Sequence, residues 1–360
     1  MKLTRRAMVG AGAGLVLLSS RAHAAGQIFT VIGTGVAGSA IDDEPVKTAR
    51  INNPFGVLFG PDGLLYWADF GSDRVLKLRN GFVSVVAGSG VKGHAGDGGP
   101  AWAAQLSAPH EIRFDSKGNM LVAERDAHVV RFMDGRTSIL STLVGTGMPG
   151  FGGDNGPAGM AQLRQPHSIA LDKDDNLYIC DIQNNRVRRR DAATGVITTF
   201  VGTGETADTP DAAPLNAPLR GPRSIDIGPD GTMYLILREG NKVFSIDPDR
   251  RIMRRIAGTG EKGHTGDGGP ARDATFNGPK GIAYAPDGSL YISDTENHVI
   301  RRVSLRDGTI STVVGTGMRG DGPGGDPLRC ALARPHGITL RDGVLYIGDS
   351  ENHRIRALHI

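Results

Sequence analysis

The stretch that decides the fold spans residues 279–317 and reads PKGIAYAPDGSLYISDTENHVIRRVSLRDGTISTVVGTG. It starts at a proline and contains four short runs rich in valine, isoleucine and tyrosine, separated by turn sequences such as Asp-Gly. Alternation of apolar residues with a period of two predicts β-strands, and Asp-Gly steps predict tight turns between them. The stretch therefore predicts four antiparallel strands.

This unit recurs six times along the chain, at intervals of about 56 residues. The proline that starts each copy is Pro54, Pro109, Pro166, Pro222, Pro279 or Pro335. The chain is also rich in turn formers, with 53 glycines and 20 prolines in 360 residues. Four-stranded antiparallel units repeated around a ring form a β-propeller. The sequence thus predicts an all-β, six-bladed β-propeller of four-stranded antiparallel blades.

Closure of the ring follows from the two ends of the repeat array. The last unit, from Pro335 to Ile360, is long enough for three strands only, whereas Ile28–Gly35 reads like the fourth strand of the other units. Pairing of this N-terminal strand into the last blade would restore the period and remove exposed sheet edges. We therefore expect the two ends of the domain to meet in one blade.

The first 24 residues have the features of an export signal. Thr4–Met8 contains two adjacent arginines, an apolar Gly/Ala-rich stretch follows, and Ala22–Ala24 offers a cleavage site. The segment resembles a twin-arginine signal, and a Sec signal with a chance Arg-Arg pair is the alternative. We expect a signal over residues 1–24, a propeller over residues 25–360, and a mature protein in the periplasm or outside the cell.

The charge of the chain excludes some partners. The expected signal contains four basic and no acidic residues, which accounts for the excess of 41 Lys and Arg over 38 Asp and Glu. The remaining chain is close to neutral, so its composition does not favour nucleic acid or an anionic membrane as a partner. No integral membrane segment is expected after signal cleavage, and a protein or an anionic small molecule is the expected partner.

The units around Tyr291–Arg301 and Tyr346–Arg356 resemble NHL repeats, and the likeness extends over residues 26–360. The linkers Gly93–Ala101 and Gly263–Ala271 are similar to linkers of bacterial NHL proteins. The resemblance implies the propeller fold. It says little about function, because such propellers include binding modules, scaffolds and a few enzymes.

The residues that follow the six repeat prolines are expected to surround the mouth of the central channel. These residues are Phe55, His110, His167, Arg223, Lys280 and His336. Three neutral imidazoles could bind a divalent metal such as Zn²⁺, and Arg223 and Lys280 could hold an anionic group. The alternative is that these residues belong only to the repeat pattern.

The Pro-His-X-Ile strand starts at His110, His167 and His336 are similar to those of streptogramin lyases and of the peptidyl-hydroxyglycine lyase core. That resemblance implies that these three histidines are metal ligands or proton donors. They are spaced unevenly, however, because His336 comes three blades after His167, and a tight triangle is not guaranteed.

Eight of the ten histidines map to loops of one rim, the rim that carries the channel mouth. They are His94, His110, His128, His167, His264, His298, His336 and His353. We therefore expect any binding surface to lie on this rim.

An acidic residue ends the second strand of five units: Asp69, Glu124, Asp181, Asp294 and Asp349. Its recurrence favours a structural role, with the acid capping a turn and pairing with a third-strand arginine such as Arg188, Arg301 or Arg356. Unit four has Leu237 instead and departs from the pattern where Arg223 replaces histidine. That departure indicates either a specialised blade or sequence drift.

Two functions are compatible with these features. The first is a non-catalytic binding or scaffold propeller that uses its His-rich rim and channel mouth. The second is a metal-assisted lyase or hydrolase acting on an anionic small molecule or peptide. The sequence assigns no catalytic residue.

Overall fold

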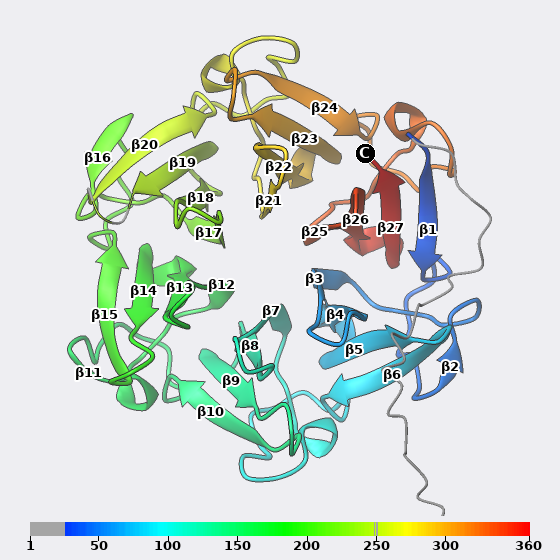
Figure 1. Ribbon diagram of the computed structural model, residues 1–360, viewed down its shortest axis with the longest axis vertical. Helices are drawn as coiled ribbons and strands as arrows, with labels where there is room; N and C mark the ends of the chain where they lie inside the picture. The colour runs from blue at the N-terminus through cyan, green and yellow to red at the C-terminus, as the bar shows by residue number, and fades with distance from the viewer. Residues whose placement is uncertain (1–25, 248, 250) are drawn as a thin grey trace, which may run out of the picture.

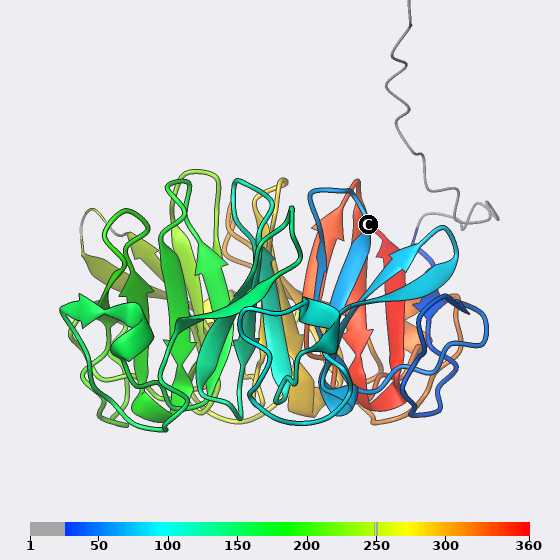
Figure 2. The same cartoon turned by 90° about the horizontal axis from the view of Figure 1, so that it is seen from below.

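The computed structural model describes residues 26–247, 249 and 251–360, which form a ring of six blades around a central axis (Figure 1). The expected export signal over residues 1–24 lies outside the described residues. Seen from the side, the blades form a flat disc with strands running between its two faces (Figure 2). The predicted six-bladed propeller is confirmed.

Each blade is an antiparallel sheet whose first strand lies at the channel and whose fourth lies on the outside. Blades 1 and 2 contain β3 (Pro54–Phe59), β4 (Leu65–Asp69), β5 (Arg74–Arg79), β6 (Phe82–Ala87), β7 (Pro109–Phe114), β8 (Met120–Glu124), β9 (Val129–Met133) and β10 (Leu140–Val144). Blades 3 and 4 contain β12 (Pro166–Leu171), β13 (Leu177–Asp181), β14 (Arg186–Arg190), β15 (Val196–Val201), β17 (Pro222–Ile227), β18 (Met233–Leu237), β19 (Lys242–Asp247) and β20 (Ile252–Ala257). Blades 5 and 6 contain β21 (Gly281–Ala285), β22 (Ser289–Asp294), β23 (Val299–Ser304), β24 (Ile310–Val314), β25 (Ile338–Arg341), β26 (Val344–Asp349), β27 (Arg354–His359) and β1 (Ile28–Ile32).

The N-terminal strand closes the ring, as predicted. β1 pairs antiparallel with β27, and the register runs from Ile28 opposite Leu358 to Ile32 opposite Ile355. Blade 6 therefore takes its outermost strand from one end of the described chain and its three inner strands from the other.

The linker that enters each blade also covers that blade's outer edge. Short strands β2 (Glu44–Pro45), β11 (Gly156–Pro157) and β16 (Ala212–Pro214) pair with the outermost strands of blades 1, 3 and 4. Single bridges do the same in the other three blades: Pro100 with Ile139, Pro270 with Thr309, and Gly325 with Ile28. The linkers thus leave little free strand edge for pairing with another chain.

The hydrophobic core is divided among the six interfaces between neighbouring blades. Between blades 1 and 2, for example, Val75 packs in one buried cluster with Leu106, Ile112 and Val122. Because each blade buries one face against each neighbour, its strands are apolar on both faces, and burial of this apolar surface drives assembly of the ring.

Four blades contain a buried arginine on the third strand that joins two acids. Arg188 of blade 3 contacts Asp181 at 3.5 Å and the linker residue Asp154 at 2.6 Å. The corresponding arginines are Arg131, Arg301 and Arg356. The predicted pairing of the second-strand acid with a third-strand arginine is therefore confirmed in blades 2, 3, 5 and 6. The predicted capping of the turn is wrong for Asp181, Asp294 and Asp349, whose side chains accept no cap hydrogen bond from the backbone of the turn that follows.

A second repeated contact connects each blade to the next. The residue before the repeat proline donates its backbone N–H to a left-handed residue after the second strand of the preceding blade. The acceptor is His128, His298 or His353 in three blades and Asp73, Asn185 or Asn241 in the others.

This contact leads to a prediction for His298, whose Nδ1 accepts from the N–H of Arg334 at 3.1 Å. His298→Ala should lower the free energy of unfolding by about 1 kcal/mol, the usual contribution of one hydrogen bond. His298→Asn should change it by less than about 0.5 kcal/mol, because Asn241 makes the same contact with Gly278 and asparagine tolerates a left-handed backbone. Urea unfolding measures both, and equal losses would contradict the assigned role.

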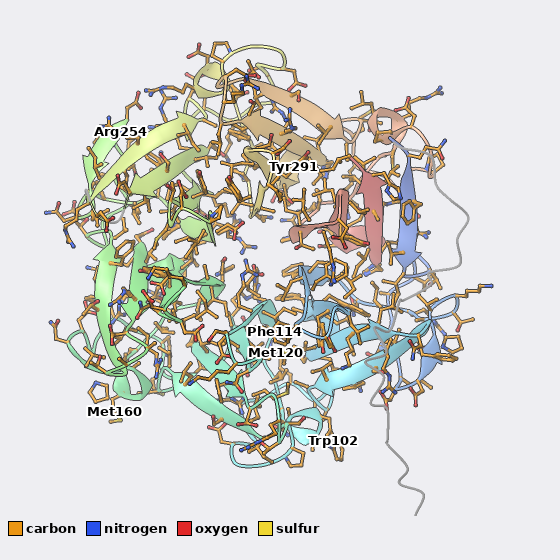
Figure 3. The ribbon with its side chains drawn as sticks, in the orientation of Figure 1. Trp102, Phe114, Met120, Met160, Arg254 and Tyr291 are labelled. Carbon is orange, nitrogen blue, oxygen red and sulfur yellow. The ribbon has the colours of Figure 1, made fainter. Side chains whose placement is uncertain are left out.

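In the part of the chain that the structure describes, no helix is long and apolar enough to cross a membrane. The helical elements are short 3-10 turns in the loops, such as η2 (Ala101–Ala103) and η3 (Ala158–Met160). These place Trp102 and Met160 on the outer circumference of the ring, far from the channel (Figure 3).

Candidate functional site

The six residues that follow the repeat prolines meet at the mouth of the channel, and we call them the channel ring. All six line one cavity of about 250 Å³. Their members are Phe55, His110, His167, Arg223, Lys280 and His336, each between 3% and 8% exposed. Each stands at or next to the start of an innermost strand, so the repeat itself brings them together. The structure therefore places these six residues where they were expected, around the mouth of the channel.

The channel is narrow directly below this ring. The space beneath it measures only about 20 Å³, roughly the room for one water molecule. A ligand at the channel mouth must therefore enter and leave from the rim.

Blade 1 contributes an aromatic wall. The rings of Phe55 and Phe70 stack at a centroid distance of 4.3 Å, and Phe55 stacks on its other face against His336 at 3.9 Å. The guanidinium of Arg125 lies over Phe70 at 4.7 Å from the ring centroid, an attractive cation–π contact. The wall is thus apolar at its base and positively charged at its edge.

The side chain of Arg223, on blade 4, crosses the channel and contacts His110 on blade 2. Its Nη2 lies 3.0 Å from Nε2 of His110. A guanidinium can only donate, so Nε2 of His110 accepts and its proton sits on Nδ1. Within the described chain that Nδ1 has no hydrogen-bond partner, and neither has Nε of Arg223. His110 is therefore held neutral by a cation on its accepting side.

His167 lies among three arginines. Burial, followed by the positive charges of Arg223, Arg125 and Arg238, holds the pKa of His167 well below its usual range. Its Nδ1 lies 2.7 Å from the carbonyl oxygen of Gln165 and donates to it when the ring is neutral. We call Arg125, Arg223 and Arg238 the arginine cluster, and all three line the cavity.

Arg223 is the member of the arginine cluster whose positive charge is least balanced by carboxylates. Burial, and then the charge of Arg238, lowers the pKa of Arg223 to about 9, although the charges of Glu111 and Glu239 act in the opposite direction, so Arg223 stays charged at neutral pH. Arg125 and Arg238, by contrast, contact the outlying acids Asp126 and Glu239 at 2.7 and 3.4 Å. No carboxylate of the described residues lies within ion-pair distance of Arg223.

The cations on the opposite side of the cavity are paired. Lys280 donates to Glu296 at 2.7 Å, and Arg334 bonds both Glu296 and Glu351 at 2.7 and 2.8 Å. Burial and the charge of Arg223 lower the pKa of Lys280 to about 7. Burial alone would raise the pKa of Glu296, but hydrogen bonds from Arg334 and Lys280 lower it to about 2. The pKa of Lys280 is lowered because Lys280 faces the charge of Arg223. The pKa of Glu296 is lowered because Glu296 accepts hydrogen bonds from a second cation, Arg334, as well as from Lys280.

The expected metal site does not fit this arrangement. Phe55 stacks on His336 and meets His110 edge-on at 4.8 Å, which places it between these two histidines. The accepting nitrogen of His110 is occupied by Arg223, whose charge opposes a divalent cation. Among residues 26–247, 249 and 251–360, no group of three or more His, Cys, Asp or Glu side chains is placed to hold a metal ion. We derive no metal chemistry from these residues.

Several residues that line the cavity were not predicted as site residues, among them Arg125 and Arg238. Arg125 and Arg238 occupy the position directly after the end of the second strand, where the other blades have Phe70, Ile182, Thr295 and Ser350. Alignment of that single repeat position would have shown arginine in blades 2 and 4 only. The sequence therefore contains this pattern, but the predicted site was limited to the residues after the prolines.

The remaining histidines of the rim are part of the repeat rather than of the cavity. His128, His298 and His353 accept the blade-to-blade hydrogen bonds described above. His94 and His264 contact the hydroxyls of Thr142 and Thr312 at 3.2 and 3.0 Å. The candidate site is thus the channel mouth alone.

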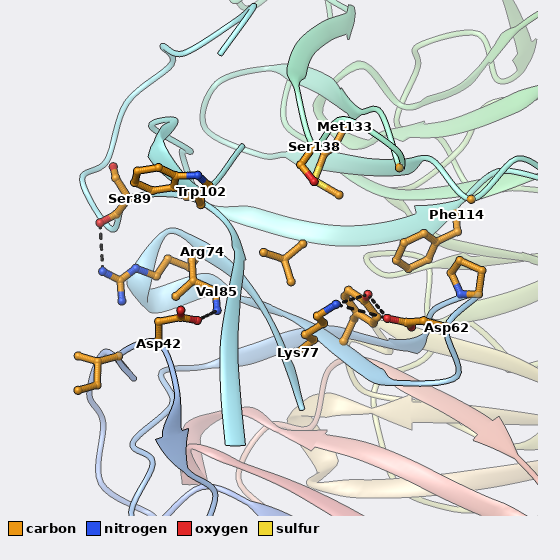
Figure 4. Close-up of a pocket in the computed structure, with 17 residues that line it drawn as sticks. Asp42, Asp62, Arg74, Lys77, Val85, Ser89, Trp102, Phe114, Met133 and Ser138 are labelled. Atoms are coloured by element: carbon orange, nitrogen blue, oxygen red, sulfur yellow. Dashed lines mark hydrogen bonds and ion pairs between the residues drawn. The ribbon is translucent and has the colours of Figure 1, made fainter. Parts of the chain in front are cut away.

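A larger groove of about 820 Å³ lies on the outer side of blades 1 and 2 (Figure 4). Its polar side chains bond one another, with the hydroxyl of Tyr66 donating to Asp62 at 2.7 Å and Lys77 lying 3.4 Å from the same acid. Blade 5 repeats this arrangement with Asp287 and Arg302 at 3.0 Å. The polar groups of the groove therefore belong to the repeat and do not mark a ligand site.

Models of known protein families match several segments of the repeat array. The NHL repeat model matches residues 163–189 and 332–358, and the Teneurin NHL domain model matches residues 245–332. The chain is a six-bladed β-propeller that contains NHL repeats. The matched segments fall in blades 3 to 6 of this NHL-repeat propeller and include the second and third strands of blades 3 and 6.

Relatives of this NHL-repeat propeller are distant and longer. It is 27% identical over 289 residues to NHL repeat-containing protein 2 of Gallus gallus, which covers 70% of this chain and 38% of that protein. It is 25% identical over 269 residues to Protein SUPPRESSOR OF QUENCHING 1, chloroplastic, of Arabidopsis thaliana, covering 71% of this chain and 25% of that protein. The chain thus matches well under half the length of these relatives.

Solved structures share the fold of the NHL-repeat propeller. An auxiliary nutrient binding protein from Bacteroides thetaiotaomicron superposes with a TM-score of 0.68 at 17% identity, covering 92% of this chain and 75% of that one. A streptogramin B lyase superposes with a TM-score of 0.55 at 14% identity, covering 92% and 97%. The resemblance to streptogramin lyases is confirmed for the fold, and these identities carry nothing beyond it.

Proposed function

We propose that this chain is an exported binding propeller that holds the anionic group of a ligand at its channel mouth. One observation carries the proposal: Arg223 is 3% exposed and charged, yet has no carboxylate partner among the described residues. A buried unpaired charge is costly, and an anion bound in the cavity would remove that cost.

The surroundings of Arg223 favour the same ligand. Arg125 and Arg238 line the cavity beside it, and buried guanidinium groups form strong bidentate contacts with oxyanions. The cavity is small for a ligand pocket, at about 250 Å³, so the bound group must be compact. Export is supported by the arginine pair and cleavage site of residues 1–24, and the nutrient binding protein among the structural neighbours is a precedent for binding on this fold.

A lyase or hydrolase acting on the same anionic ligand is the second candidate. It is favoured by the neutral imidazole of His167, whose Nδ1 donates to Gln165 and whose ring lies beside the arginine cluster. A neutral imidazole can accept a proton from a bound substrate. This candidate requires turnover of a ligand that binds, whereas the first requires binding alone.

The test is binding of acetate, sulfate, phosphate and citrate by calorimetry at constant ionic strength. We expect at least one of them to bind, and Arg223→Met to weaken its binding at least tenfold, about 1.4 kcal/mol. The same variant should unfold no more easily than the wild type, because it removes an unpaired buried charge. Arg254→Met changes an exposed arginine on the outer edge of the ring (Figure 3) and should leave binding unchanged. Absence of binding by all four anions, or equal binding by Arg223→Met, would overturn the proposal.

A further inference from the structure

We infer that the bound group is the doubly charged phosphoryl group of a phosphomonoester, and that the rest of the ligand leaves the cavity along blades 1 and 2. This inference rests on the proposed function and specifies its ligand. Three features carry it: the positive charge of the arginine cluster, the narrow channel below the ring, and the uncharged wall formed by Phe55 and Phe70.

The arginine cluster brings three positive charges to the cavity. Arg223 has no carboxylate within ion-pair distance among the described residues, and Arg125 shares Asp126 with Lys92, which lies 2.7 Å from that acid. Neither Asp126 nor Glu239, the acid that contacts Arg238, lines the cavity. A carboxylate supplies one charge and two acceptor oxygens. A phosphoryl group supplies nearly two charges and three strong acceptor oxygens, which match three converging guanidinium groups.

The floor of the cavity determines where the rest of the ligand goes. Because only about 20 Å³ remains below the channel ring, the phosphoryl group is the deepest part of the ligand. The group attached to it must then point towards the rim.

The acids around the mouth select the direction of that exit. Glu351 lines the cavity on blade 6, and Glu296 contacts Lys280 beside it. Lys280 and Arg334 balance these two acids, so this side offers an anion no unpaired cation. On blade 1, Phe55 and Phe70 line the same cavity and present no negative charge. An uncharged apolar or aromatic body attached to the phosphoryl group would pack against Phe70, and it would gain free energy from the apolar surface it buries.

The test compares four probes by calorimetry: phenyl phosphate, inorganic phosphate, sulfate and benzoate. At pH 7.5 we expect phenyl phosphate to bind at least fivefold more tightly than inorganic phosphate, and benzoate to bind at least tenfold more weakly than phenyl phosphate. Phe70→Ala should remove the advantage of phenyl phosphate while keeping the affinity for inorganic phosphate, which also shows that the variant is folded. Trp102→Ala, in the outer groove, should change neither.

The charge of the ligand is tested by pH. The second pKa of a phosphomonoester is about 6, so lowering the pH from 7.5 to 5 should weaken phenyl phosphate by about tenfold relative to sulfate, which stays doubly charged. Sulfate reports any change in the protein itself, since the charged and titratable groups facing the ligand are common to both probes. Those groups are Arg125, Arg223, Arg238, Lys280, Arg334, Glu111, Glu239, Glu296, Glu351, His110, His167 and His336.

The outcomes separate this inference from the function on which it rests. Binding of phosphate and sulfate with the same pH dependence would overturn the doubly charged group and leave anion binding intact. Equal affinity of phenyl phosphate and inorganic phosphate would overturn the exit along blade 1. Failure of all the probes in this comparison and of all four anions in the earlier panel would overturn the proposed function itself.

Discussion

Arg188→Met is expected to lower the free energy of unfolding by about 3–5 kcal/mol, the usual cost of removing one partner of a buried ion pair. Arg188 is fully buried and joins Asp181 to Asp154, while also donating to the carbonyl oxygens of Gln162 and Gly152. Methionine fills much of the same volume but donates no hydrogen bond. Asp181 would then be a buried acid with no cation beside it.

The chain contains the control for this prediction. In blade 4 the two equivalent positions are Leu237 and Phe244, both fully buried and apolar. The double variant Asp181→Leu/Arg188→Phe copies that pair into blade 3 and should recover at least half of the lost stability, because a well-packed apolar pair often replaces a buried ion pair at little cost. Arg254→Met should stay within about 0.5 kcal/mol of the wild type. Urea unfolding measures all three, and a double variant less stable than Arg188→Met would refute the equivalence.

Asp69→Asn is expected to stabilise the protein at alkaline pH. Asp69 is fully buried, and the third-strand position that holds Arg188 in blade 3 is Leu76 in blade 1. Its side chain accepts hydrogen bonds from the N–H of Asn52 at 2.9 Å and the indole of Trp67 at 3.2 Å, and it also contacts the hydroxyl of Ser72. Burial outweighs these bonds and raises the pKa of Asp69 to about 7.

The raised pKa of Asp69 determines how the stability of the protein changes with pH. A carboxyl with a raised pKa binds its proton more tightly in the folded state, so its contribution to stability is present at low pH and is lost as the pH rises towards 7. Asparagine does not titrate, and its amide can donate to Ser72 while its oxygen keeps the other two bonds. Between pH 4.5 and pH 8, the stability of Asp69→Asn relative to the wild type should therefore increase by about 3 kcal/mol.

Unfolding in urea at the two pH values measures this difference directly. Glu261→Gln, at an exposed acid, provides the comparison and should show the same offset from the wild type at both pH values. A constant offset for Asp69→Asn as well would show that this acid is ionised in the folded protein throughout the range.

The fold could be predicted almost completely because every blade repeats one pattern of alternation and turns. Six prolines gave the number of blades, and the missing strand of the last unit identified Ile28–Ile32 as the closing strand. The channel ring was found for the same reason, since one repeat position maps to one place in the ring. Even the pairing of Asp181 with Arg188 followed from recurrence.

The chemistry of the candidate site was harder to predict because it depends on where side chains point. The metal expectation required His110, His167 and His336 to meet in one site despite their uneven spacing, but Phe55 lies between two of them and Arg223 reaches across the channel to His110. No repeat pattern encodes such contacts between distant blades. The arginines missed in the sequence come from a different loop than the histidines that were considered.

The pairing of β1 with β27 has a consequence for the order of folding. Residues from the two extremes of the described chain form one sheet, whereas every other four-stranded blade consists of strands that are consecutive in the chain. During synthesis the earlier blades can form as their segments emerge, but the ring cannot close until its final strand has been made. Until then β1, the outer strand of the last blade, has no partner strand. A chain truncated before Arg354 lacks β27 and should remain an open ring with two exposed sheet edges.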